Sequence, residues 1–404
     1  MSPQMRPQGN LHCTPYALPL LLLILLSELW IFLHAASTAH AEKMSDETEA
    51  VKLLSLLEIP SQIPEKLMLA LNAGINASLW SYNYQVADGR KIKIILPSTA
   101  NKNITQIINS TLTKHNDLLA VLGPLGDHNT LNALPILDKN SLVAFAPFTV
   151  SAQVRVWDPY LYFLRPEPNA ELLTLIRYAL NYLRVRRLGF MYLKNFISGY
   201  VEYRRATKVI SQLGYSLCGV FAVKKSTSNI DNENFNKEWE TFAQTRPQAV
   251  IVFGAPIKDT EKFIMRMLTD KRTAGAYLLG PFAVQQTLLR VWREAVNAGV
   301  PFVRGQVITT GTNPLAKDTQ YAAIKRFQTV MGKYLKESGQ TIFNDTQHFL
   351  NNDEDGEMMV SGWISGEVLM QAMNTREWLK DRASFVKSLF NQRRYLIDDL
   401  VIGE

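Results

Sequence analysis

The sequence contains little cysteine and little histidine, and both shortages exclude particular kinds of site. Cys13 and Cys218 are its only cysteines. Cys13 lies in a segment that we expect to be removed, so the mature chain would contain no internal disulfide. Cys218 falls in an expected strand and is interpreted as a buried thiol, with an intermolecular bridge as the alternative. The six histidines include no pair at helical spacing, which argues against a zinc site. We expect no metal and no cofactor.

Common catalytic motifs are also missing. There is no Gly-x-Ser-x-Gly turn, no glycine-rich phosphate loop and no His-Glu-x-x-His pair. The acidic run at 351–357 superficially resembles a calcium loop, but its spacing lacks the alternating ligands of such a loop. A solvated turn before a helix, with carboxylates near the helix N-terminus, is the better interpretation. We nominate no catalytic residue.

The net charge of +7 is modest for 404 residues, and the basic residues are scattered. The short basic runs at 184–187 and 224–225 have no aromatic residues interleaved with them. Nucleic-acid surfaces combine clustered positive charge with stacking rings, so we expect no nucleic acid as a partner.

The first 41 residues have the pattern of an export signal. A polar start with Arg6 and His12 precedes apolar runs at 17–26 and 29–33, and Ala39-His40-Ala41 follows. Glu28 interrupts the apolar stretch, which favours a cleaved signal peptide at 1–41 over an uncleaved signal anchor, the alternative. Export agrees with four glycosylation sequons, which begin at Asn76, Asn103, Asn109 and Asn344. We expect the secretory pathway.

From residue 51 onward, short apolar strands alternate with amphipathic helices. The first run has strands at 51–57, 91–96, 118–122 and 142–146 and helices at 64–80, 104–115 and 130–137. An extended, proline-containing crossover at 157–166 follows. The second run has helices at 171–183, 200–213, 234–245, 260–268 and 283–298 and strands at 187–193, 215–223, 248–253 and 276–279. Such alternation predicts α/β architecture with parallel sheets flanked by helices.

The end of the chain departs from this rhythm. We expect a strand at 305–310, helices at 320–336, 356–373 and 381–390, and a last strand at 395–402. If this part returns to the first unit, several crossovers join two lobes and form a hinge. The expected divisions are 42–160 for lobe 1, 161–303 for lobe 2 and 304–404 for the return. The similarity of 121–126 to 278–283 supports two alike halves, unless Gly-Pro simply ends both strands.

Ligands of open parallel sheets bind beyond the carboxyl ends of the strands, and this rule selects four loops. The candidate ligand-binding residues in them are Gly126, Asp127, Phe148, Thr149, Asn195, Phe196, Gly254 and Ala255. Backbone donors, a hydroxyl, a carboxylate and apolar walls suit a small polar or zwitterionic ligand. The alternative for Asp127 is that it only caps the helix it opens.

Three segments resemble one protein family. The segments are QAVIVFGAPIKDT at 248–260, GQVITTGTNPLAKD at 305–318 and NQRRYLIDDLVIG at 391–403. They are similar to the ectodomain of trypanosomatid receptor-type adenylate cyclases. The resemblance extends from about residue 51 to 403. It implies a type I periplasmic-binding-protein-like fold that senses an extracellular ligand. In the family, a single membrane span and an intracellular cyclase domain that works as a dimer follow.

The resemblance therefore implies an extracellular receptor domain of cAMP signalling, truncated before the span and the cyclase, and inactive as a cyclase by itself. The expected partner is a small extracellular ligand of unknown identity, and homodimers or heterodimers with related receptors are further candidates. We expect the cell surface if the chain is part of a longer receptor, and secretion if it ends at Glu404. The alternative functions are a non-catalytic partner or decoy that dimerises with full-length receptors and, more weakly, a freestanding enzyme.

Overall fold

The computed structural model describes residues 50–60, 64–97, 103–194, 199–224, 232–392 and 394–403. The chain separates into two units, Met1–Ala50 and Val51–Glu404, and all the elements named below lie in the second. The expected signal peptide at 1–41 lies outside the described residues.

The first sheet is formed by five parallel strands in the order β2-β1-β3-β4-β5. Their bounds are β1 Val51–Ser55, β2 Ile92–Ile95, β3 Leu118–Leu122, β4 Val143–Phe145 and β5 Leu161–Tyr162. Every residue of β3 and β4 is buried. Continuous aliphatic runs of this kind are typical of parallel strands that are covered on both faces.

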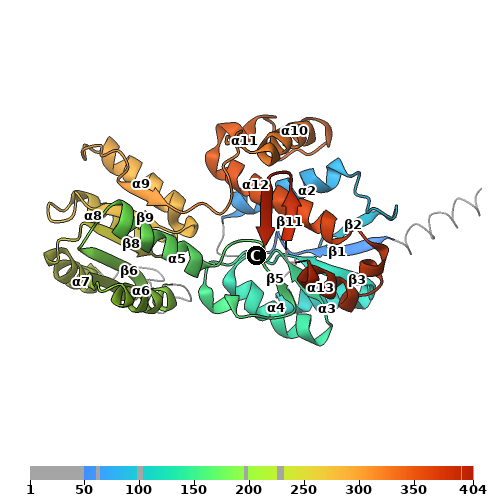
Figure 1. Cartoon of the computed structure of the whole chain (residues 1–404), viewed down its shortest axis with the longest axis horizontal. Helices are drawn as coiled ribbons and strands as arrows, with labels where there is room; N and C mark the ends of the chain where they lie inside the picture. Colours follow the sequence, from blue (N-terminus) through green and yellow to red (C-terminus); the bar gives the residue numbers. More distant parts are fainter. Residues whose placement is uncertain are drawn as a thin grey trace, which may run out of the picture. The chain divides into compact units, whose positions relative to one another are not determined.

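Helices cover both faces of this sheet (Figure 1). One face packs against α2 (Glu65–Ser81) and α12 (Asp353–Ala372), and α10 (Ala322–Glu337) packs against these two helices. The other face packs against α3 (Ile104–Lys114) and α4 (Asp127–Lys139). The sheet and these helices form what we call the first lobe.

The second sheet repeats the topology of the first. Its order is β10-β9-β8-β6-β7, so in both sheets the first strand lies between the second and the third. The bounds are β6 Leu188–Lys194, β7 Leu217–Lys224, β8 Ala249–Phe253, β9 Tyr277–Gly280 and β10 Val307–Thr309. All pairings are parallel. The prediction of two α/β lobes with parallel sheets is confirmed.

The helices of this second lobe also form two layers (Figure 1). One face of the sheet packs against α5 (Pro168–Arg177) and α6 (Tyr200–Gln212), and a π-helical turn, Tyr178–Tyr182, extends α5. The other face packs against α7 (Asn232–Gln244), α8 (Lys258–Thr269) and α9 (Gln285–Asn297).

The C-terminal part returns to the first lobe, where α10, α12 and α13 (Arg382–Asn391) contribute to one core. A short helix, α11 (His348–Asn351), precedes α12. The prediction of a single last strand at 395–402 is wrong. The chain instead forms an antiparallel hairpin of β11 (Arg394–Ile397) and β12 (Leu400–Gly403), because Asp398 adopts a left-handed conformation with φ of 53° and turns the backbone.

Strand pairing places the passages between the lobes slightly later than the expected boundaries. β5 pairs with β4 although we expected lobe 2 to begin at 161, and β10 pairs with β9 although we expected the return to begin at 304. The similar segments 121–126 and 278–283 begin in two strands, β3 and β9, that do not occupy equivalent places in their sheets. β3 is third in its sheet, whereas β9 is the fourth strand along the chain of its own. Cys218 in β7 is half-buried rather than buried.

Glycine allows α12 to pack closely against α2 (Figure 1). A Cβ atom on Gly362 would lie 2.0 Å from the carbonyl oxygen of Leu71, and one on Gly74 would lie 2.1 Å from that of Met359. Only glycine permits backbones to approach this closely. Nearly all of α12 is consequently buried.

Candidate functional site

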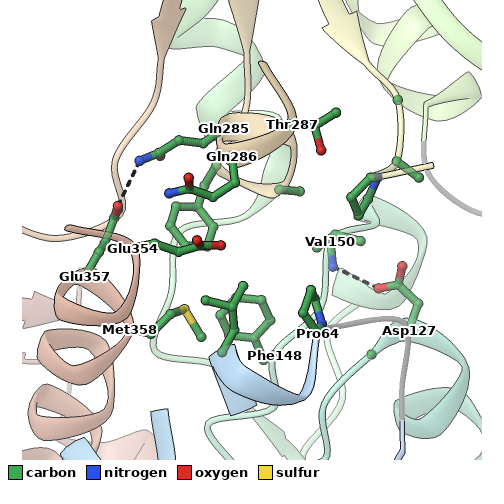
Figure 2. Close-up of a pocket in the computed structure, with 17 residues that line it drawn as sticks. Pro64, Asp127, Phe148, Val150, Gln285, Gln286, Thr287, Glu354, Glu357 and Met358 are labelled. Carbon is green, nitrogen blue, oxygen red and sulfur yellow. Dashed lines mark hydrogen bonds between the residues drawn. The ribbon is translucent and has the colours of Figure 1, made fainter. Parts of the chain in front are cut away.

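A cavity of about 110 Å³ is lined by loops and helix ends of both lobes. Figure 2 shows its side chains converging from several elements. The first lobe contributes Pro64, Leu67, Gly126, Asp127, Phe148, Val150, Glu354, Glu357 and Met358. The second contributes Gly254, Ala255, Pro256, Phe282, Ala283, Gln285, Gln286 and Thr287. The loops follow β3, β4, β8 and β9, at the carboxyl ends where open parallel sheets bind ligands.

The structure brings most of the nominated ligand-binding residues together. Gly126, Asp127, Phe148, Gly254 and Ala255 all line the cavity. Thr149 lines a smaller neighbouring hollow instead, and its hydroxyl accepts a hydrogen bond of 3.0 Å from Nε of Arg155. Asn195 and Phe196 lie outside the described residues.

Helices also line the cavity, and the sequence did not indicate them. Glu354, Glu357 and Met358 come from the first turns of α12, and Gln285, Gln286 and Thr287 come from the start of α9. Asn352 caps α12, since its side-chain oxygen accepts hydrogen bonds from the backbone of Glu354 and Asp355. Carboxylates therefore do open a helix, as expected. The turn is solvated as expected, since Asn351 and Asp353 are exposed. The interpretation fails for Asp355 and Glu357, which are 0% and 2% exposed.

Asp127 fixes the loop after β4 rather than capping its own helix. Its Oδ1 accepts hydrogen bonds from the backbone nitrogens of Val150 (2.9 Å) and Ser151 (3.2 Å). The N-cap of α4 is Gly126, without a side-chain cap. Burial raises the pKa of Asp127, although these two hydrogen bonds act in the opposite direction.

A second buried carboxylate holds the same loop from the other lobe. Glu202, on α6, is 0% exposed and accepts hydrogen bonds from the backbone nitrogens of Ala152 (3.0 Å) and Gly199 (2.6 Å). The loop at 150–152 is therefore bound by one carboxylate of each lobe. Its three backbone donors are all used within the protein.

Glu357 and Gln285 form a direct polar contact between α12 and α9. Nε2 of Gln285 donates a hydrogen bond of 3.1 Å to Oε2 of Glu357 (Figure 2). Burial raises the pKa of Glu357 to about 7, the charge of Glu171 adds to this rise, and the hydrogen bond from Gln285 and the charge of Arg165 oppose it. This carboxyl group therefore titrates near neutral pH.

Behind the apolar wall, Arg165 lies against two rings. Its guanidinium carbon is 4.0 Å from the ring centroid of Phe148 and 4.8 Å from that of Phe282. Glu171 accepts a hydrogen bond of 2.8 Å from the backbone nitrogen of Phe282. Burial, assisted by the charge of Arg165, lowers the pKa of Arg155 to about 10, and burial lowers the pKa of Arg165 as well. The guanidinium group of arginine nevertheless stays protonated in proteins. Arg165 stabilises the aromatic wall through cation–π contacts.

The adenylate cyclase, periplasmic binding protein-like domain family matches residues 170–311. Receptor-type adenylate cyclase ESAG 4 of Trypanosoma brucei brucei is 49% identical over 348 residues, which are 85% of this chain and 28% of that protein. The chain is related to the receptor-type adenylate cyclases of trypanosomatids. GRESAG 4.3 of the same organism is 42% identical over 88% of the chain and 29% of its own length. Receptor-type adenylate cyclase B of Leishmania donovani is 29% identical, over 92% of the chain and 30% of its own length.

The chain therefore spans less than a third of the length of these curated relatives. In the described part of the chain, no helix combines the length and the apolar character needed to cross a bilayer.

Solved structures share the fold at low sequence identity. An extracellular ligand-binding receptor from Verminephrobacter eiseniae aligns with a TM-score of 0.63 and 16% identity, covering 87% of this chain and 92% of the other. A periplasmic binding protein type 1 from Bordetella pertussis aligns with a TM-score of 0.61 and 12% identity, covering 88% and 91%. At these identities the likeness shows the fold alone, and that fold is the type I periplasmic-binding-protein fold.

Proposed function

We propose that this chain is the extracellular ligand-binding region of a receptor in the adenylate cyclase family, and that it holds a small molecule in the cavity between its lobes. The observation that supports this most is the cavity itself. Loops at the carboxyl ends of β3 and β4 and of β8 and β9 line it together. A ligand in this position contacts both lobes at once, as in hinged α/β proteins that close around their ligands.

Blocking the cavity tests this function. Replacing Ala283, which lines the cavity, with phenylalanine fills the space with a ring. Thermal unfolding of the wild type and this variant is measured with a set of small cations, anions, zwitterions and neutral compounds. We expect at least one compound to stabilise the wild type but not Ala283→Phe. Ala298→Phe, which adds the same ring at the exposed end of α9, is the matched control and should respond like the wild type. Equal stabilisation of all three proteins would contradict binding in the cavity.

We further propose that the ligand acts in cAMP signalling through a longer receptor, because the curated relatives are named receptor-type adenylate cyclases. Cell-surface placement and export through the secretory pathway belong to the same proposal. Glycosylation of exposed asparagines is also part of this proposal. Pairing with a second copy or with a full-length relative is tested by co-purification from cells that express both.

A further inference from the structure

The ionisable groups among the described residues that line the cavity are all acids. They are Asp127, Glu354 and Glu357. Cations lie nearby without lining the cavity: the guanidinium of Arg165 lies against the rings of Phe148 and Phe282, the charge of Arg155 acts on Asp127, and that of Lys66 acts on Glu354. The polar side of the cavity therefore presents negative charge without a cation of its own.

Two of these carboxylates have an oxygen without a hydrogen-bond partner. Within the described structure neither Oδ2 of Asp127 nor Oε1 of Glu357 accepts a hydrogen bond of ordinary geometry, although the backbone N–H of Thr312 lies close enough to the Glu357 carboxylate to lower its pKa, and each residue is 2% exposed. A buried carboxylate oxygen without a donor is destabilising, and a ligand that supplies an N–H group removes this penalty. Figure 2 shows Glu357, Glu354, Gln285 and Gln286 grouped on one side of the cavity, opposite Asp127.

The rest of the lining suits an apolar body. Phe148, Phe282, Val150, Met358 and Leu67 contribute rings and aliphatic groups to the wall. The volume of about 110 Å³ is somewhat smaller than the roughly 150 Å³ of an engineered cavity that accepts benzene. A ligand of about six non-hydrogen atoms is the size that this comparison supports.

The backbone nitrogens of the loop at 150–152 are not available to a carboxylate on the ligand, which leaves it the side-chain donors of Gln286 and Thr287. The backbone nitrogens of Val150 and Ser151 already donate to Asp127, and that of Ala152 donates to Glu202. An added anion would also lie near the lining acids, and like charges repel strongly where water is excluded. Anions and amino-acid zwitterions are therefore disfavoured relative to simple cations.

We propose, building on the function above, that the cavity selects a small organic cation: a protonated primary amine on a short apolar chain. The ammonium group binds Glu357 and its neighbour Glu354, with the side-chain oxygens of Gln285 and Gln286 as further acceptors. The chain lies against Phe148 and Met358. Asp127, on the opposite side, adds negative charge that rejects anionic ligands.

Four probes with apolar chains of similar length test this selection in calorimetric titrations of the full chain at pH 8. Pentylamine has the proposed charge, pentan-1-ol is its neutral counterpart, pentanoate is the anion, and norleucine is pentylamine with an added carboxylate. We expect pentylamine to bind at least roughly tenfold more tightly than each of the other three, the scale of one charge-assisted hydrogen bond. Equal or tighter binding of the alcohol, the acid or norleucine would overturn the proposal.

Removing the charge of Glu357 provides the second test. Glu357→Gln keeps the shape of the side chain and should lower the affinity for pentylamine roughly tenfold while leaving that for pentan-1-ol unchanged. Asp353→Asn is the matched control, since Asp353 lies one turn earlier on α12 and its side chain is 72% exposed. Unchanged amine affinity in Glu357→Gln would refute the assignment of Glu357.

The outcomes also separate this inference from the proposed function. If pentanoate or norleucine binds most tightly and Ala283→Phe abolishes that binding, the cavity is a ligand site and only the cation selectivity is wrong. If no probe of any charge binds to the wild type, this inference is overturned, and the wider set of compounds in the Ala283→Phe experiment decides whether the proposed binding function fails as well.

Discussion

Replacing Gly362 with alanine tests the close approach of α12 to α2, on which the position of Glu357 depends. The new Cβ would lie 2.0 Å from the carbonyl oxygen of Leu71 and 3.0 Å from the backbone nitrogen of Ile75. Ordinary contacts begin at 3.4 Å, so the two backbones must separate by more than an ångström to admit the methyl group. Neither neighbouring atom belongs to a side chain that could turn away.

The sign of the effect follows from two opposing terms. Alanine is favoured over glycine inside a helix by about 1 kcal/mol. Overpacking of a well-packed core costs about 1–3 kcal/mol and occasionally more, and contact with backbone atoms places Gly362→Ala at the upper end or beyond. We therefore expect a net loss of about 2 kcal/mol or more in the free energy of unfolding. With a urea slope of about 3 kcal/mol/M for a chain of this size, the midpoint should fall by more than half a molar.

Equilibrium unfolding in urea, followed by tryptophan fluorescence, to which buried Trp363 contributes, measures this loss. Gly332→Ala is the matched control, because Gly332 also lies inside a helix, α10, but its Cβ would find its nearest neighbour at 3.8 Å. There only the helix preference applies, and the variant should be about 0.5–1 kcal/mol more stable than the wild type. A midpoint for Gly362→Ala at or above that of the wild type would refute the close packing of α2 and α12.

Three further predictions concern buried carboxylates and glycans. Burial raises the pKa of Glu357 from 4.5 to about 7, so between these two pH values the folded state holds a proton that the unfolded chain releases. The free energy of unfolding should therefore fall by up to about 1.4 kcal/mol per pH unit as the pH rises from 4.5 to about 7. Urea unfolding at several pH values should show a flatter profile for Glu357→Gln, and parallel profiles would contradict the assignment. Glu202→Gln should lower the free energy of unfolding by about 1.5–3 kcal/mol and speed hydrogen exchange at the backbone amide of Ala152. Unchanged exchange at this amide would show that the Glu202 carboxylate does not hold the loop at 150–152. After expression in a glycosylating host, glycopeptide mass spectrometry should find Asn76 unmodified, because its amide nitrogen donates to Asn72 within α2; a glycan there would contradict this. Glycans are expected at the exposed residues Asn103, Asn109 and Asn344.

Most of the fold could be predicted because parallel strands have a distinctive composition. Residues 118–122 and 249–253 are unbroken aliphatic or aromatic runs, and all of them are buried in β3 and β8. Such runs need cover on both faces, which only flanking helices supply. The final hairpin was missed because Asp398 and Asp399 lack the glycine that usually marks a tight turn. Asp399 has another role, since its carboxylate accepts hydrogen bonds from the backbone of Ala322 and Ala323 at the start of α10.

The candidate site could be predicted only where it depends on topology. The ends of parallel strands lie at one edge of a sheet whatever their side chains, so Gly126 and Gly254 were found without knowledge of packing. Glu357 could not be found in this way. A carboxylate near the start of a helix can be exposed to solvent or buried, and the sequence pattern does not distinguish the two. The close packing of α12 against α2 determines that Glu357 is buried. That contact joins residues nearly 300 positions apart in the sequence.

The cavity and the connection between the lobes share residues, and this couples binding to the arrangement of the lobes. Asp127 lines the cavity and also holds the loop at 150–152, which Glu202 holds from the second lobe. Glu357 lines the cavity and also accepts the hydrogen bond from Gln285. A ligand shifts a conformational equilibrium only by the difference in its affinity for the two states. An ammonium ion that binds Glu357 and Gln285 together favours the arrangement in which α12 faces α9, whereas a ligand held by one lobe alone shifts nothing, however tightly it binds. If the proposed function holds, the domain responds to the ligands that bridge its lobes, and the polar contacts that select the ligand also determine the response.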